Sequence, residues 1–80
     1  MLNQELTRFT VMQRRDGIWK VYESGLDRPL GTFVLKNDAV EYALRFAATR
    51  KAWKVEVVDA DEMVSATFDG TGGKQRKEND

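Results

Sequence analysis

Two segments near the N-terminus alternate between apolar and polar residues, as strands do when one face is buried. Residues 8–14 form the first run and residues 18–23 the second. Asp16 and Gly17 lie between them, and an Asp-Gly pair is typical of a hairpin turn because glycine accepts a positive φ. The pattern predicts a β-hairpin with these inward residues: Phe9, Val11, Gln13, Trp19 and Val21.

A helical pattern follows over Lys36–Arg50. Its apolar stripe has the i, i+3, i+4, i+7 spacing of one helix face and consists of Val40, Ala43, Leu44 and Ala47. Asn37 or Asp38 suits the helix start. Before the helix, residues 24–31 contain the only proline and are expected to form a loop, and residues 32–34 approach the helix in extended form. The small residues of the stripe would let the helix lie close to a sheet.

Two further strands are expected, over residues 53–58 and 63–68, joined by an acidic turn at 59–62. The residues expected to face inward in them are Trp53, Val55, Val57, Val64, Ala66 and Phe68. Residues 1–7 read as a flexible arm, residues 8–70 as one domain and residues 71–80 as a disordered tail without apolar anchors.

The element order β-β-α-β-β predicts the α+β class. A right-handed crossover with the third predicted strand beside the first gives a four-stranded sheet of order 2-1-3-4. Every pairing in this sheet is expected to be antiparallel. One helix would cover one face, and the other face would stay open.

Trp-Lys-Val occurs twice, at residues 19–21 and 53–55, and contains both tryptophans. Both rings alternate in phase with valines, which favours packing under the helix over base stacking. The two lysines, Lys20 and Lys54, then point to the open face.

The chain resembles a family of small bacterial proteins known as domain of unknown function 2188. The resemblance spans about residues 8–70 and rests on short motifs, which are Phe9-Thr10-Val11, residues 15–21, Lys36-Asn37-Asp38-Ala39, residues 55–61 and Phe68-Asp69-Gly70. The family usually has threonine where this chain has Leu35, and glycine where it has Glu62. The family has no established activity, so the resemblance implies a fold and no site.

The composition excludes several kinds of chemistry. Cysteine and histidine are both absent, which removes thiolate and imidazole metal ligands and the usual general base. The acidic turn at 59–62 has too few carboxylates for a calcium cage and suits local backbone bonding. The glycine-rich stretch at 70–73 lacks the following helix of a phosphate-binding loop. The sequence therefore predicts no enzyme, no cofactor and no metal.

The net charge is zero but unevenly spread. Residues 1–7 carry −1 (Glu5), residues 8–54 carry +5 (ten Lys and Arg, five Asp and Glu), and residues 55–80 carry −4 (three against seven). A basic middle could attract an anionic partner, whereas a neutral whole argues against strong non-specific nucleic-acid binding. A secretory pattern and a membrane-length apolar run are both missing from the sequence, which favours the cytoplasm.

The open sheet face is the strongest candidate site. Its expected members with a partner role are Met12, Arg14, Ile18, Lys20, Tyr22, Lys54, Val58 and Met63. Apolar residues among basic ones suggest a homodimer interface or another protein contact. RNA or single-stranded DNA is the alternative, with Tyr22 stacking and the cations neutralising phosphates. An ordinary exposed face stays a third possibility. We expect a non-enzymatic association module.

Overall fold

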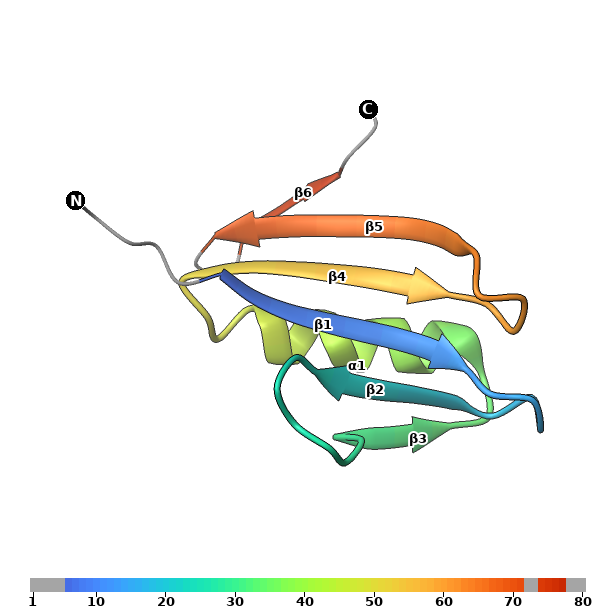
Figure 1. The fold of residues 1–80 in the computed structure, drawn as a ribbon. Helices are drawn as coiled ribbons and strands as arrows, with labels where there is room; N and C mark the ends of the chain where they lie inside the picture. Colours follow the sequence, from blue (N-terminus) through green and yellow to red (C-terminus); the bar gives the residue numbers. More distant parts are fainter. Residues whose placement is uncertain (1–5, 72–73, 78–80) are drawn as a thin grey trace.

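A computed structural model describes residues 6–71 and 74–77 (Figure 1). It contains one helix and six strands in a single sheet. The elements in chain order are β1 (Leu6–Gln13), β2 (Trp19–Glu23), β3 (Gly31–Phe33), α1 (Lys36–Ala47), β4 (Ala52–Val58), β5 (Val64–Thr71) and β6 (Lys74–Lys77). The α+β class and the single helix are confirmed.

The strand order is β3-β2-β1-β4-β5-β6, so the predicted neighbours of the four main strands are correct. The prediction that every pair is antiparallel is wrong, because β1 and β4 run parallel. The cause is β3, a strand that the sequence pattern suggested only as an extended approach to the helix. It pairs antiparallel with β2 and so reverses the chain once more before α1. The helix then returns the chain to the opposite end of the sheet, so that β4 runs in the same direction as β1.

The two ends of the fold also differ from expectation. β1 begins at Leu6, inside the segment expected to be a flexible arm. Residues 74–77 form β6, which pairs antiparallel with β5 inside the segment expected to be disordered. Backbone pairing needs no apolar side chain, so an absence of apolar residues did not exclude a strand here. The remaining residues of both expected segments, 1–5, 72–73 and 78–80, lie outside the described part.

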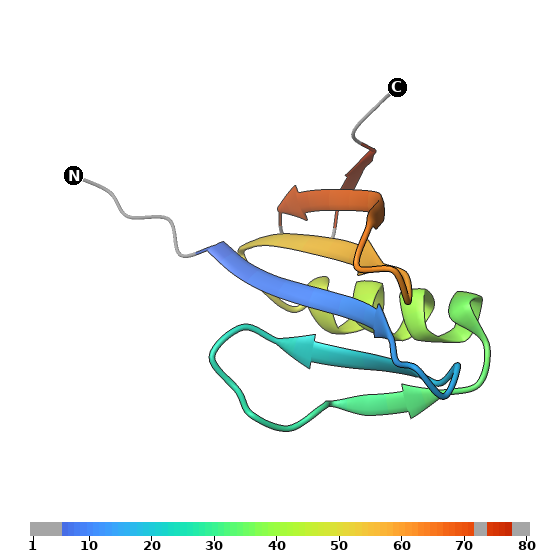
Figure 2. The same ribbon diagram turned by 45° about the vertical axis from the view of Figure 1, so that its right-hand side comes forward.

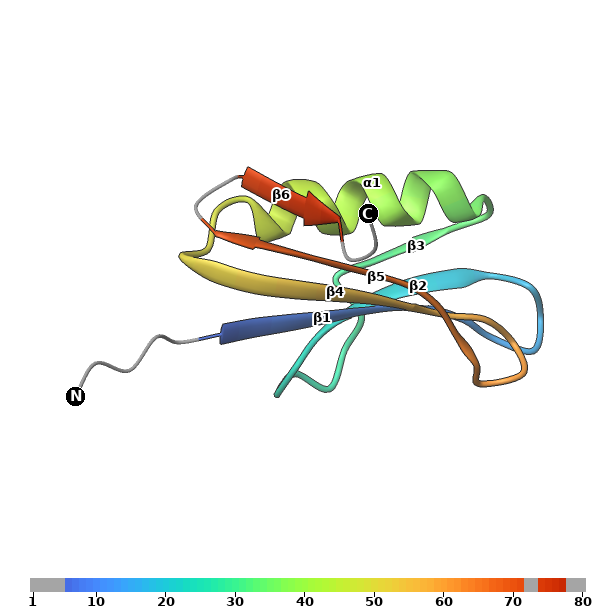
Figure 3. The same ribbon diagram turned by 90° about the horizontal axis from the view of Figure 1, so that it is seen from above.

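The helix lies against one face of the sheet and the other face is open (Figures 2 and 3). Three alanines one turn apart, Ala39, Ala43 and Ala47, are completely buried under it. They let the helix approach a sheet whose inner face carries Phe9, Val11, Trp19, Val21, Trp53, Val55 and Val57. The crossover from β3 through α1 to β4 is right-handed, as such connections nearly always are.

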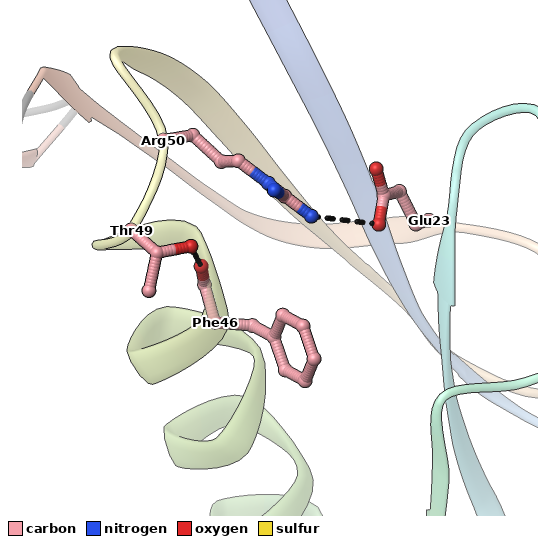
Figure 4. A network of polar contacts seen from close by, with 4 residues as sticks. All are labelled: Glu23, Phe46, Thr49 and Arg50. Carbon is pink, nitrogen blue, oxygen red and sulfur yellow. Dashed lines mark hydrogen bonds and ion pairs between the residues drawn. The ribbon is translucent and has the colours of Figure 1, made fainter.

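The carboxyl end of the helix is tied to the end of β2 by one ion pair. Arg50 Nη2 lies 3.1 Å from Glu23 Oε1, and both side chains are partly buried (Figure 4). The Thr49 hydroxyl donates to the carbonyl of Phe46 at 2.7 Å. The ordered helix stops at Ala47, three residues before the predicted end at Arg50, and these contacts fix the turn beyond it.

Three aromatic rings fill the space between the helix and the edge strand β3. Tyr42 packs on Phe33 with ring centroids 5.0 Å apart and on Phe46 at 5.5 Å. The Tyr42 hydroxyl donates to the carbonyl of Leu30 at 3.1 Å. Gly31 lies directly against this cluster, and a β-carbon there would come within 3.0 Å of Phe33 and 3.1 Å of Tyr42. The cluster explains why the short third strand stays attached.

Replacing Gly31 by alanine should lower the free energy of unfolding by about 1–3 kcal/mol, because the added methyl group overpacks the two rings. Urea denaturation followed by tryptophan fluorescence would measure the change. Thr32→Ala, at an exposed position of the same strand, is the matched control. An unchanged or higher stability would contradict the prediction, since alanine otherwise stabilises through the unfolded chain.

The helix starts without a side-chain cap. Leu35 occupies the N-cap position with an extended backbone (φ −105°, ψ 138°), and its side chain carries no hydrogen-bond acceptor. The backbone is therefore already in the conformation that a serine cap adopts. Leu35 is 60% exposed, so its removal sacrifices little burial.

Leu35→Ser should raise the free energy of unfolding by about 1 kcal/mol, because the hydroxyl can accept a hydrogen bond from an unpaired amide of the first turn. Thermal unfolding should show a melting temperature higher by roughly 4–8 °C. Val34→Ser, one residue outside the helix and 75% exposed, is the control and should show no gain. Equal effects of the two substitutions would contradict a capping origin.

Candidate functional site

The open face is built from three rows of side chains that cross the central strands. Strand register defines the rows, because directly paired residues point to the same side of a sheet. The first row is Lys20, Met12, Val58 and Val64; the second is Tyr22, Thr10, Glu56 and Thr67; the third is Arg8, Lys54 and Asp69. The first row is mostly apolar and the third is fully charged, so the face has an apolar end and a charged end.

A β-bulge decides which residues of β5 belong to the apolar end. The register shifts between Val57 and Val58, so that Val58 pairs with Val64. A shift of one residue moves a side chain to the opposite face of a sheet. The prediction that Val64 points inward is therefore wrong: it lies on the open side and is 55% exposed. Met63, predicted on the open face, instead lies just before β5 and is 62% exposed.

Five of the other predicted face residues lie where the alternation placed them. Met12, Lys20, Tyr22, Lys54 and Val58 belong to the three rows and are half-buried by their neighbours. Arg14 and Ile18 flank the turn between β1 and β2, joined by a bond from the Arg14 amide to the Ile18 carbonyl at 2.8 Å. The Arg14 guanidinium contacts Met12 Sδ at 3.3 Å and so covers part of the apolar end.

Two oppositely charged turns lie side by side at the apolar end (Figure 1). The basic turn, residues 14–17, follows β1, and the acidic turn, residues 59–62, follows β4. A hollow of about 690 Å³ lies between them, and its lining consists of Met12, Gln13, Arg14, Arg15, Val58, Asp59, Ala60 and Glu62. The antiparallel pairing predicted from the sequence would separate these turns, and their proximity follows from the parallel pairing of β1 with β4.

The acidic turn is held by its own first residue. The Asp59 carboxylate accepts hydrogen bonds from the amides of Asp61 and Met63, each at 3.1 Å. Glu62 has a positive φ of 66°, which explains why a glycine would suit this position. In the described part of the chain, no group of three or more acidic, Cys or His side chains is arranged to hold a metal ion. The two bonds to Asp59 are the local backbone bonding that the sequence predicted for this turn.

A second hollow lies at the charged end, where the loop after β2 extends toward the open side (Figure 3). Its volume is about 240 Å³, and its lining consists of Arg8, Thr10, Tyr22, Glu23, Ser24, Gly25, Leu26, Lys54 and Glu56. Arg8 was not among the predicted face residues. It has the same parity as Thr10 and Met12, so extending the alternation by one step would have found it.

Arg8 and Lys54 are directly opposite each other in the parallel ladder. Like charges in such a position destabilise a sheet unless something neutralises them. Within the ranges that the structure describes, the ion pair of Arg50 with Glu23 is the one with an N–O distance below 4.0 Å, so neither cation is paired. Glu56 and Asp69 neighbour them in the rows and leave the charged end nearly neutral.

Among the described residues, no polar or charged side chain is fully buried on the helix side of the sheet. Trp19 and Trp53 are 7% and 2% exposed, which confirms that both rings belong to the core and not to a stacking platform. The Trp53 Nε1 is buried without a hydrogen-bond partner among the described residues. Between α1 and β5 lies an apolar groove of about 470 Å³, whose lining consists of Lys36, Asn37, Val40, Glu41, Leu44, Val57, Ala66 and Phe68.

Comparison with known proteins adds nothing to this geometry. The chain matches no protein-family model, no curated protein and no solved structure. The resemblance to domain of unknown function 2188 therefore stays a prediction. None of the described helices has both the length and the apolarity needed to cross a bilayer.

Proposed function

We propose that this protein is a non-enzymatic association module that forms a homodimer through the apolar end of its open sheet face. The supporting observation is the row formed by Met12, Val58 and Val64, which faces away from the helix on the open side of the sheet. Association would bury this row, and burial of apolar area is the main driving force of most protein contacts.

The size of the chain supports the same proposal. Eighty residues form a small core, and the helix contributes only alanines as its completely buried residues. A domain of this size buries a modest share of its surface, so burial against a second copy adds stability where the monomer has little. Its place in the cytoplasm stays a prediction from the sequence.

Val64→Glu should weaken dimerisation at least about tenfold, because it places an unpaired charge in the apolar row. Sedimentation equilibrium over a range of protein concentrations would measure the dissociation constant. Val34→Glu adds the same charge at an exposed position next to the helix and is the control. A wild-type chain that stays monomeric at high micromolar concentration would contradict the proposal, as would equal dissociation constants for the two variants.

Binding of RNA or single-stranded DNA is the second candidate function. It is supported by the hollow at the charged end, which Tyr22 lines together with the loop after β2 and with Arg8 and Lys54, two cations that have no ion pair among the described residues. An aromatic ring on an open sheet beside basic side chains suits a stacked base with its phosphate. One tyrosine and a nearly neutral end make this the weaker candidate.

Titration with short single-stranded poly-uridine should shift the NMR signals of Arg8, Tyr22 and Lys54 if the second candidate is correct. The shifts should shrink as salt increases, because phosphate contacts release counterions. Tyr22→Leu should reduce the affinity by removing the stacking ring, whereas Tyr22→Phe keeps a ring at the same place and should retain the affinity. Unchanged spectra at low salt would exclude this function.

A further inference from the structure

The basic and acidic turns have a geometry that selects one arrangement of two copies. β1 and β4 are central, parallel and adjacent. Two copies can meet through their open faces around an axis that lies between the faces, parallel to the strands and above the midline of β1 and β4. This axis places β1 of one copy over β4 of the second copy. A two-fold axis of this kind makes an interface self-complementary. Met12 of one copy would then lie over Val58 of the second copy.

The same axis keeps both turns at the same end of the pair. The basic turn that follows β1 would lie over the acidic turn that follows β4 in the second copy, and the contact would occur twice. Figure 3 shows that the acidic turn extends farther toward the open side than the basic turn does. One turn therefore protrudes where the other recedes, and their charges are opposite.

We infer that the second copy is recognised by reciprocal ion pairs between Arg14 or Arg15 of one copy and Asp59 or Glu62 of the other, around an apolar contact of Met12 with Val58. This inference rests on the proposed homodimer. The four charged residues line one hollow within a single chain, yet the structure places no ion pair between the two turns in the described residues. Their charges are thus available to a partner.

The charged end restricts the contact to the apolar end. Under the same axis Arg8 of one copy would lie over Lys54 of the second copy, and like charges would repel there. Packed sheets lie about 10 Å apart, and a two-fold axis parallel to the strands allows both faces to tilt by the same angle, so the faces can diverge toward the charged end. The hollow beside Tyr22 would then stay accessible in the dimer.

Charge reversal at one turn tests the inference. Arg14→Glu and Glu62→Lys should each weaken homodimerisation at least about tenfold, because each places like charges opposite each other twice. Lysine keeps the long unbranched side chain at the positive φ of residue 62. Arg45→Glu and Glu41→Lys make the same charge changes on the exposed side of the helix and should leave the dissociation constant unchanged.

Two combinations of the charge reversals show whether the two turns contact each other. A 1:1 mixture of the Arg14→Glu and Glu62→Lys chains should recover a heterodimer close to wild-type affinity, since every turn contact again joins opposite charges. The double variant in one chain should recover the homodimer. This recovery excludes loss of the Arg14 contact with Met12 as the cause of the single-variant effect.

The outcomes separate the inference from the proposed function. A monomeric wild-type chain would overturn both. A wild-type dimer that Val64→Glu weakens, and that neither charge reversal affects, would keep the proposed homodimer and overturn the turn-to-turn recognition. The turn-to-turn recognition would also be overturned if each single reversal weakened dimerisation but neither the mixture nor the double variant recovered it.

Discussion

The parallel pairing of β1 with β4 is the constraint on which the rest of the structure depends. Seven residue pairs, from Leu6 with Ala52 to Met12 with Val58, join the two strands in the middle of the sheet. Every other neighbouring pair in the sheet is antiparallel. A parallel pair cannot be closed by a hairpin, so a crossover is required, and the helix is that crossover. The pairing thereby fixes which sheet face is covered and which stays open.

The open face combines an apolar environment and a charged environment. Cross-strand register separates an apolar row beside the turns from a charged row beside the loop after β2. Because β1 and β4 are parallel, the turns that leave them lie at the same end and bring opposite charges together. An antiparallel arrangement would have put those turns at opposite ends of the sheet, and the hollow between them would not exist.

The covered face shows how a small chain combines large aromatic residues with a close helix. Three alanines leave room for Trp19, Trp53 and Phe9 beneath the helix, and a ring cluster around Tyr42 closes the side next to β3. The other side, next to β5, keeps an apolar groove beside Val40 and Leu44. The helix is too narrow to cover a six-stranded sheet, so its cover ends before β5.

Period-2 alternation identified from the sequence alone the core residues of the central strands around Phe9, Trp19 and Val55, and the helical stripe identified Ala43 and Ala47. They did so because burial on one face depends on local spacing. The same alternation placed Lys20, Tyr22 and Lys54 on the open face. Tertiary structure decided the direction of β4. This direction depends on β3, and a strand of three residues is too short to give a periodic signal in the sequence. It also decided the bulge that turns Val64 outward, since register is a property of two strands and not of one.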